Sequence, residues 1–207
     1  MKLSHPIQNK LDSNCTVIMD GGTGTEISRR GIPLDSGRSW SASANVNSPD
    51  VIQEIHEDYI QAGAEIIIAN TFSTRRSLLA RTGLDHLTEE INFKAVNLAL
   101  VAREKCAIDK SSVIVAGSMS TFEPMDQAKI IPSYEEALRN YKEQANLLVE
   151  AGVDIIILEM FIRTLDTMAA IEATNRLDIP IWVGFSCESF EDQIYLGIKG
   201  QHANETL

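Results

Sequence analysis

Two short segments of the chain match each other almost position for position, and both predict the same structural unit. Residues 62–68 have the sequence AGAEIII, and residues 151–157 have the sequence AGVDIII. Each copy combines the end of a helix, a glycine turn and a continuous apolar run. Apolar strands that are buried on both faces belong to parallel sheets covered by helices. The repeat therefore predicts a chain of alternating strands and helices.

The rest of the sequence continues this alternation. Ser48 and Pro49 suit the cap and first position of one helix, and Ser133 with Glu136 forms a capping box for another. Further helices are predicted over residues 87–106 and 164–177, and the tail after residue 190 has little pattern. Strands are predicted over residues 16–20, 65–70, 112–117, 154–159 and 181–186.

An α/β fold of the (β/α)₈ TIM-barrel type is the simplest architecture for these units, with an open doubly wound sheet as the alternative. A closed barrel needs eight strands and typically about 250 residues. The chain has 207 residues and five predicted strands, so we expect an incomplete barrel with about five of the eight units.

Composition narrows the class of partner. The formal net charge of −11 argues against nucleic acid and against an anionic membrane surface. No apolar run approaches the roughly 18 residues that a membrane span needs, and the N-terminus lacks the apolar region of a secretory signal. The three cysteines are too few and too scattered for a disulfide framework, which favours a cytoplasmic location.

The segment DGGTGTE places a carboxylate at the end of the first predicted strand. Active sites of α/β barrels lie at the carboxyl ends of the strands, so Asp20 is a candidate site residue. Gly21 and Gly22 allow the backbone to approach a ligand closely, and the alternative is a tight turn that Asp20 caps. No lysine follows the last glycine, so the segment is not a Walker phosphate loop.

Polar residues also end two later strands. Asn70, Thr71 and Phe72 offer an amide, a hydroxyl and an apolar wall, or alternatively a solvated loop. Glu159 follows an apolar run at the rim of the core, where a carboxylate is costly without a cation or several donors. A substrate ammonium is one such cation, and the neighbouring Arg163 is the alternative. Asp20 and Glu159 would then face one pocket suited to an amino group.

Other titratable residues have weaker claims. Cys187 ends the last predicted strand, and a buried structural cysteine is favoured there over a nucleophile or a metal ligand. His56 lies on a helix that packs outside the barrel, and His86 and His202 lie in polar surroundings. A lyase that uses Glu159 as its base is a further alternative.

Four motifs in this order, DGGTGTE, HEDYIQAGAEIIIANTF, VAGSMS and DIIILEMF, resemble the homocysteine S-methyltransferase family from about Thr16 onward. The resemblance implies a (β/α)₈ barrel that transfers a methyl group from a small donor to the homocysteine thiol, giving methionine. It implies zinc, held by three cysteines, which keeps the thiol as a thiolate. It also implies that Asp20 and Glu159 hold the amino group, and that the pocket is lined by Gly21, Gly22, Asn70, Thr71 and Phe72.

The sequence departs from that family at its zinc ligands. It has neither the adjacent cysteine pair nor the Gly-x-Asn-Cys context of the family. We therefore expect residues 1–14 to form an extension and residues 15–207 to form a C-terminally truncated homocysteine-binding barrel domain. Such a chain contains the residues that bind the amino acid and lacks the zinc cysteines. The alternative is a non-catalytic amino-acid-binding or interaction protein.

Overall fold

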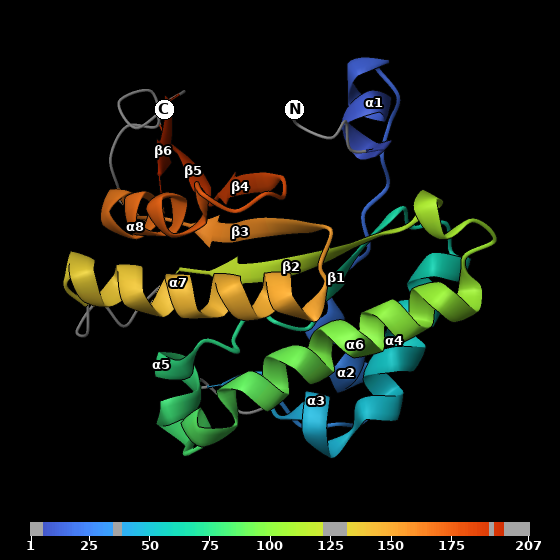
Figure 1. Cartoon of the computed structure of the whole chain (residues 1–207), viewed down its shortest axis with the longest axis horizontal. Helices are drawn as coiled ribbons and strands as arrows, with labels where there is room; N and C mark the ends of the chain where they lie inside the picture. The colour runs from blue at the N-terminus through green and yellow to red at the C-terminus, as the bar shows by residue number, and fades with distance from the viewer. Residues whose placement is uncertain (1–5, 35–38, 122–131, 191–192, 197–207) are drawn as a thin grey trace.

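A four-stranded parallel sheet with the order β1-β2-β3-β4 forms the centre of the molecule (Figure 1). The computed structural model describes residues 6–34, 39–121, 132–190 and 193–196. Before β1, Met19 forms an isolated parallel bridge with Ile66, so the first predicted strand lies beside β1. The expected parallel sheet is confirmed, although the first strand is reduced to this bridge.

The sheet is formed by alternating strands and helices. The four parallel strands are β1 (Ile66–Ala69), β2 (Ile114–Ser120), β3 (Ile155–Phe161) and β4 (Ile181–Phe185). The α-helices are α1 (Pro6–Asp12), α2 (Thr23–Arg29), α3 (Ala44–Asn47), α4 (Pro49–Gln61), α5 (Arg76–Leu79), α6 (Thr88–Cys106), α7 (Tyr134–Ala151) and α8 (Thr164–Thr174). Short 3₁₀ turns are η1 (Ala80–Thr82), η2 (Asp85–Leu87) and η3 (Lys110–Ser112). The four later predicted strands and their helices are confirmed within a few residues.

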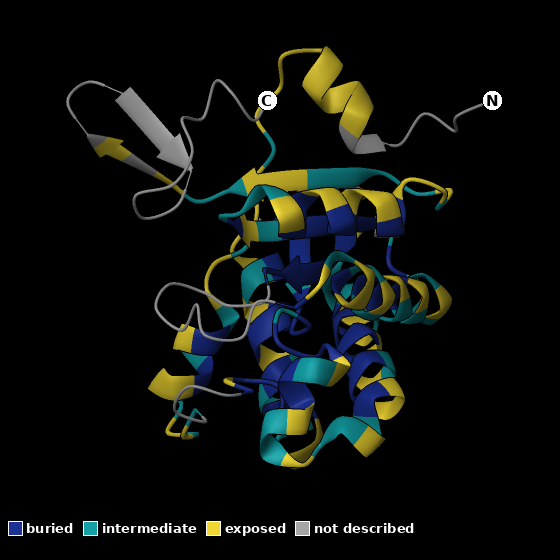
Figure 2. Cartoon of the chain, turned by 90° about the vertical axis from the view of Figure 1, so that its left-hand side faces the viewer, coloured by how far each residue is buried: buried dark blue, intermediate teal, exposed yellow. Residues whose placement is uncertain are grey.

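The two faces of the sheet pack against different partners. One face forms the larger core with α4, α6, α7 and α8, and its members include Val115, Tyr141 and Ile156. The other face packs strand against strand, through Ile66, Ile114, Ala116, Ile155 and Ile157. Figure 2 shows burial concentrated where strands and helices meet. Helices on one face and strand residues alone on the other are the layers of a barrel wall.

The order of the strands separates the two architectures that the sequence leaves open. Neighbours in the sheet follow the order of the chain without a reversal. A doubly wound sheet reverses its order at a switch point, and it carries helices on both faces. The observed sheet therefore has the connectivity of a (β/α) barrel.

Strand β4 is the least buried of the four parallel strands. Each of its five residues is partly or fully exposed, whereas all seven residues of β2 are buried. After β4 the chain forms an antiparallel hairpin, β5 (Cys187–Phe190) with β6 (Gln193–Leu196). The sequence predicts no strand after residue 186, so both strands of this hairpin are additional to the predicted elements.

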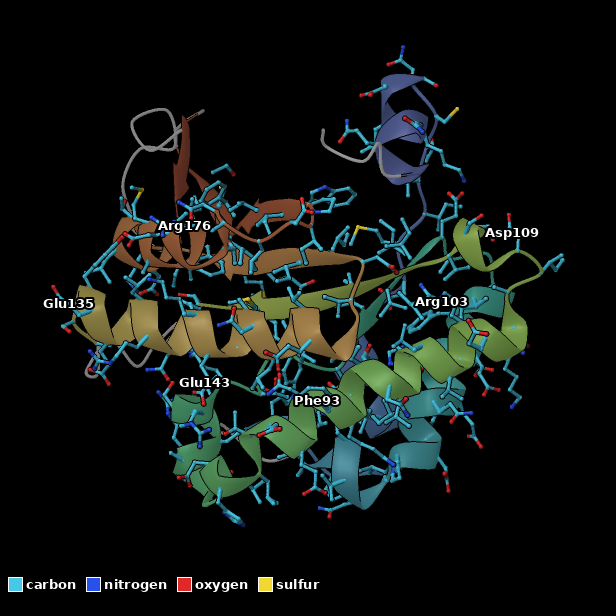
Figure 3. The ribbon with its side chains drawn as sticks, in the orientation of Figure 1. Phe93, Arg103, Asp109, Glu135, Glu143 and Arg176 are labelled. Carbon is cyan, nitrogen blue, oxygen red and sulfur yellow. The ribbon has the colours of Figure 1, made fainter. Side chains whose placement is uncertain are left out.

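Ion pairs tie the helices to one another and to the sheet. Arg103 lies on α6 (Figure 3). Its guanidinium donates to the Asp154 carboxylate at 2.7 Å, and the same oxygen accepts the Val115 N–H at 2.8 Å. Arg76 on α5 pairs with Glu143 on α7 at 2.6 Å. No helix in the described residues is long and apolar enough to cross a membrane.

Helix α7 begins with the predicted cap. The Ser133 hydroxyl accepts the Glu136 N–H at 3.2 Å. We expect Ser133→Ala to lower the free energy of unfolding by about 1 kcal/mol, because one helix N–H loses its acceptor. The predicted Ser48 cap is wrong, because Ser48 precedes α4 without a side-chain cap bond. Ser48 is therefore the matched control, and Ser48→Ala should change stability by less than about 0.5 kcal/mol. Urea denaturation of both variants measures the difference, and equal losses would contradict the cap assignment.

Candidate functional site

Asp20 follows the first strand and is held against β1. Its N–H donates to Ile66 O at 2.9 Å, and its carboxylate Oδ2 accepts the Ile68 N–H at 2.7 Å. The second oxygen, Oδ1, is buried and has no hydrogen-bond partner among the residues that the structure describes. A buried carboxylate oxygen without a donor is costly in a stable fold, so this atom is a candidate for contact with a ligand.

Glu159 lies near the end of β3, within a β-bulge. Leu158 pairs with Val183 and Phe161 pairs with Phe185, so two residues of β3 stand opposite one residue of β4. The second of them, Met160, adopts a positive φ of 56°, which is rare for a residue with a side chain.

The bulge changes which face the next side chain occupies. Leu158 and Phe161 both pack in the core beneath the helices, although they are three positions apart. Regular alternation would place them on opposite faces. The bulge therefore keeps Phe161 in the core while Glu159 stays on the same face as Ile157.

Both carboxylates have raised pKa values, and the Glu159 charge contributes to the shift of Asp20. Burial raises the pKa of Asp20 to about 7, the Ile68 N–H opposes this rise, and the nearby Glu159 charge adds to it. Burial also raises the pKa of Glu159, against the effect of the Ser118 hydroxyl, which donates to Oε2 at 2.7 Å. Two partly buried carboxylates with raised pKa values form a site that favours a cation or a proton.

The cation that the sequence offered as an alternative partner is used elsewhere. Arg163 donates to Asp166 Oδ2 through Nη2 at 2.9 Å and through Nε at 3.2 Å. No ion pair of Asp20 or Glu159 occurs within the described ranges of the chain. The carboxylate pair is thus not neutralised by Arg163.

The glycine segment runs past aromatic side chains. A Cβ at Gly21 would lie 2.8 Å from Tyr59 Oη, and one at Gly24 would lie 2.9 Å from the Trp40 ring. The Trp40 ring also meets Phe72 edge-on, with centroids 5.8 Å apart. Both predicted glycines, 21 and 22, are exposed beside Asp20. These contacts place an aromatic pair against the glycine segment.

Asn70 and Thr71 are buried and engaged within the protein. The Asn70 amide donates to Ser41 O at 3.0 Å and to Asn45 Oδ1 at 2.9 Å, and its Oδ1 accepts the Ser41 hydroxyl at 2.6 Å. The Thr71 hydroxyl bonds both backbone groups of Ser118. Neither side chain lies in a solvated loop, which was the alternative, and both link strand ends to neighbouring segments.

The remaining candidates lie outside this site. Cys187 is exposed at the start of β5, so the expected buried structural cysteine is wrong. His56 is fully buried in α4, His86 is exposed as expected, and His202 lies outside the described residues. No group of three or more His, Cys, Asp or Glu side chains suited to a metal occurs in the described part of the chain. These residues therefore do not supply a zinc site.

Fold and site together define an α/β barrel protein with paired carboxylates at the ends of its strands. A model of the family described as homocysteine S-methyltransferase matches residues 17–206. The chain belongs to the homocysteine S-methyltransferase family.

Similar proteins agree with this assignment. Homocysteine S-methyltransferase 2 of Zea mays is 30% identical over 189 residues, covering 82% of this chain and 56% of its own length. Homocysteine S-methyltransferase of Escherichia coli is 29% identical over 187 residues, covering 86% of this chain and 59% of its own length. The chain thus spans less than two thirds of these relatives.

The solved structures identify the fold. The metallated form of the homocysteine methyltransferase MmuM from Escherichia coli superposes with a TM-score of 0.83 at 25% identity, covering 97% of this chain and 72% of that one. The expected TIM-barrel type, present in part, is confirmed. The metallated state is a property of MmuM, and the superposition places no metal in this chain.

Proposed function

We propose that this chain is the homocysteine-binding part of a homocysteine S-methyltransferase, and that Asp20 and Glu159 hold the ammonium group of the amino acid. One observation carries the proposal: the partly buried Asp20 carboxylate has an oxygen without a hydrogen-bond donor and lies close enough to Glu159 for that charge to raise its pKa, and neither carboxylate has an ion-pair partner among the described residues. An ammonium group supplies both the missing charge and three N–H donors. Its binding would offset the burial of the pair.

The other predicted site residues divide into two groups in this proposal. Gly21, Gly22 and Phe72 line the pocket, because they adjoin Asp20 or the aromatic pair. Asn70 and Thr71 act as scaffold, since their polar groups already bond within the protein. The family resemblance is the ground for placing homocysteine, and not another primary amine, in this pocket.

Methyl transfer is proposed for the whole protein. Zinc, when bound, would hold the homocysteine thiol as a thiolate nucleophile. The described residues do not supply its ligands, so the role proposed for this chain is limited to binding and orienting the amino acid. The methyl donor, a small molecule, is proposed from the family alone, as is a place in methionine biosynthesis.

Two further proposals rest on the family match and on the cysteines. Residues 1–14 form an extension before a homocysteine-binding domain, which is consistent with a family match that begins at residue 17. A cytoplasmic location is proposed because all three cysteines are free thiols.

Calorimetry tests directly whether Asp20 and Glu159 bind the ammonium group of the amino acid. We expect homocysteine to bind the 207-residue chain, and 4-mercaptobutyrate, which lacks only the amino group, to bind at least about 30-fold more weakly. Glu159→Gln should weaken homocysteine binding in the same range. Glu150→Gln is the control, because this exposed residue lies at the end of α7 that leads into the start of β3. Equal binding of the two ligands would refute the proposed role of the carboxylates.

A further inference from the structure

The Thr71 side chain is fully buried just beyond the end of β1, between the buried Asn70 and the half-buried Phe72. Its hydroxyl accepts the Ser118 N–H at 2.8 Å and donates to Ser118 O at 2.9 Å. A single hydroxyl thus satisfies both backbone groups of one residue on the neighbouring strand. This arrangement fixes the position of Ser118 relative to β1.

Ser118 passes this constraint to Glu159. The Ser118 side chain lies on the same face of the sheet as Ala116, the face that no described helix covers, whereas the next residue, Met119, packs beneath the helices. Ser118 is 1% exposed, and its hydroxyl donates to Glu159 Oε2 at 2.7 Å. No hydrogen bond to the other carboxylate oxygen, Oε1, occurs among the residues that the structure describes.

We propose that Thr71 and Ser118 form a positioning relay, in which Thr71 fixes the Ser118 backbone and the Ser118 hydroxyl holds the Glu159 carboxylate in place for an incoming ammonium group. The inference rests on the proposed function of Asp20 and Glu159. It assigns Thr71 a role through Ser118 and not through contact with the substrate. Ser118 becomes a specificity element, because it favours the anionic form of Glu159.

Electrostatics around Glu159 support this role. Burial raises the pKa of Glu159, and the Ser118 hydroxyl is the group that opposes the rise. The Glu159 charge acts on Asp20, whose pKa it raises, while Arg163 and Asp166 at the start of α8 pair with each other. Strand β4 has no titratable side chain. Without the Ser118 donor, Glu159 would hold a proton more readily and attract an ammonium group less.

The test combines homocysteine calorimetry with a carbon-13 NMR titration of the Glu159 carboxyl group, on the full 207-residue chain. Ser118→Ala removes only a hydroxyl, and we expect it to raise the pKa of Glu159 and to weaken homocysteine binding roughly tenfold. Thr71→Val, which keeps the shape and loses the hydroxyl, should act in the same direction, and Thr71→Ser should restore wild-type values. The double variant Ser118→Ala/Thr71→Val should bind no more weakly than the weaker single variant.

The two readouts separate failure of the relay from failure of the proposed function. An unchanged Glu159 pKa in a folded Ser118→Ala chain would overturn the relay, whatever the ligand does. Wild-type protein that binds no homocysteine would refute the proposed function, while the titration would still decide the relay. If Thr71→Val does not fold, Ser118→Ala and Thr71→Ser decide alone. Fully additive losses in the double variant would also overturn the relay.

Discussion

Replacing Asp20 with asparagine is expected to stabilise the folded chain at neutral pH, although the same change removes a proposed ligand contact. Asparagine keeps an oxygen for the Ile68 N–H and loses the charge that burial and Glu159 disfavour. Burial raises the pKa of Asp20 from 3.8 to about 7, so the unfolded chain releases this proton far more readily than the folded chain. At about 1.4 kcal/mol per pH unit, the gain at pH 8 is about 2–4 kcal/mol.

The sign of the effect gives the experiment its pH window. The folded state binds more protons than the unfolded state between the two pKa values, so the Asp20 contribution is present below pH 3.8 and is lost as pH rises to about 7. Urea denaturation should therefore give a large gain for Asp20→Asn at pH 8 and almost none near pH 4. Asp178→Asn is the control, because this exposed side chain should change stability by less than about 0.5 kcal/mol. A less stable Asp20→Asn at pH 8 would contradict the assignment.

A gain of stability on loss of a site residue has a physical basis. A site that awaits a cation keeps its carboxylates close together and partly dehydrated, and the folded chain bears that cost until the ligand binds. A carboxylate held for structural reasons shows the opposite behaviour. The Glu57 pKa is lowered by hydrogen bonds with Gln53 and Lys105, which outweigh its burial. The two kinds of carboxylate are thus distinguished by their partners more than by their burial.

The sequence was sufficient to place Asp20 and Glu159 at one end of the sheet. Both follow short apolar runs, and the carboxyl ends of neighbouring parallel strands meet at one edge. The repeat at residues 62–68 and 151–157 predicted two strands of the sheet, β1 and β3, and Glu159 lies on the second of them. The spacing of apolar residues and the positions of glycines are local properties of a sequence, which is why this part of the fold could be predicted.

The roles of Asn70 and Thr71 could not be read in the same way. Their partners, Ser41, Asn45 and Ser118, lie 25 to 47 residues away along the chain, and no local pattern joins them. A polar residue at a strand end looks the same in sequence whether it faces a ligand or a neighbouring backbone. Only the contacts distinguish the two.

The bulge at Met160 also could not be predicted from the sequence. A positive φ is usually signalled by glycine or asparagine, and methionine gives no such signal. The run DIIILEMF has the apolar pattern of a regular strand, so it gave no indication that Phe161 returns to the core beneath the helices. The register with β4 is a tertiary property, and it decides which side chain reaches the site.

His56 provides the second large effect, with the opposite sign. The ring is fully buried in α4, and neither nitrogen has a hydrogen-bond partner among the described residues. Burial lowers the pKa of His56 from 6.5 to about 4. Between these values the unfolded chain binds the proton and the folded chain does not. The His56 contribution is therefore present above pH 6.5 and is lost as pH falls to about 4, at a total cost of about 3 kcal/mol.

Asp20 and His56 therefore oppose each other over much of the same pH range, and paired variants separate them. Asp20→Asn removes the opposing contribution of Asp20 and leaves that of His56. The free energy of unfolding of this variant should therefore fall more steeply than that of wild type on acidification from pH 7 to pH 4. His56→Leu leaves the contribution of Asp20, so its free energy of unfolding should fall less than that of wild type, or rise, over the same pH range. His86→Gln, at an exposed position, should follow the wild-type curve. Urea denaturation at intervals of half a pH unit measures all four curves. Parallel curves for wild type and His56→Leu would show that the buried ring gains its proton without cost, because the helix opens locally or water reaches the ring.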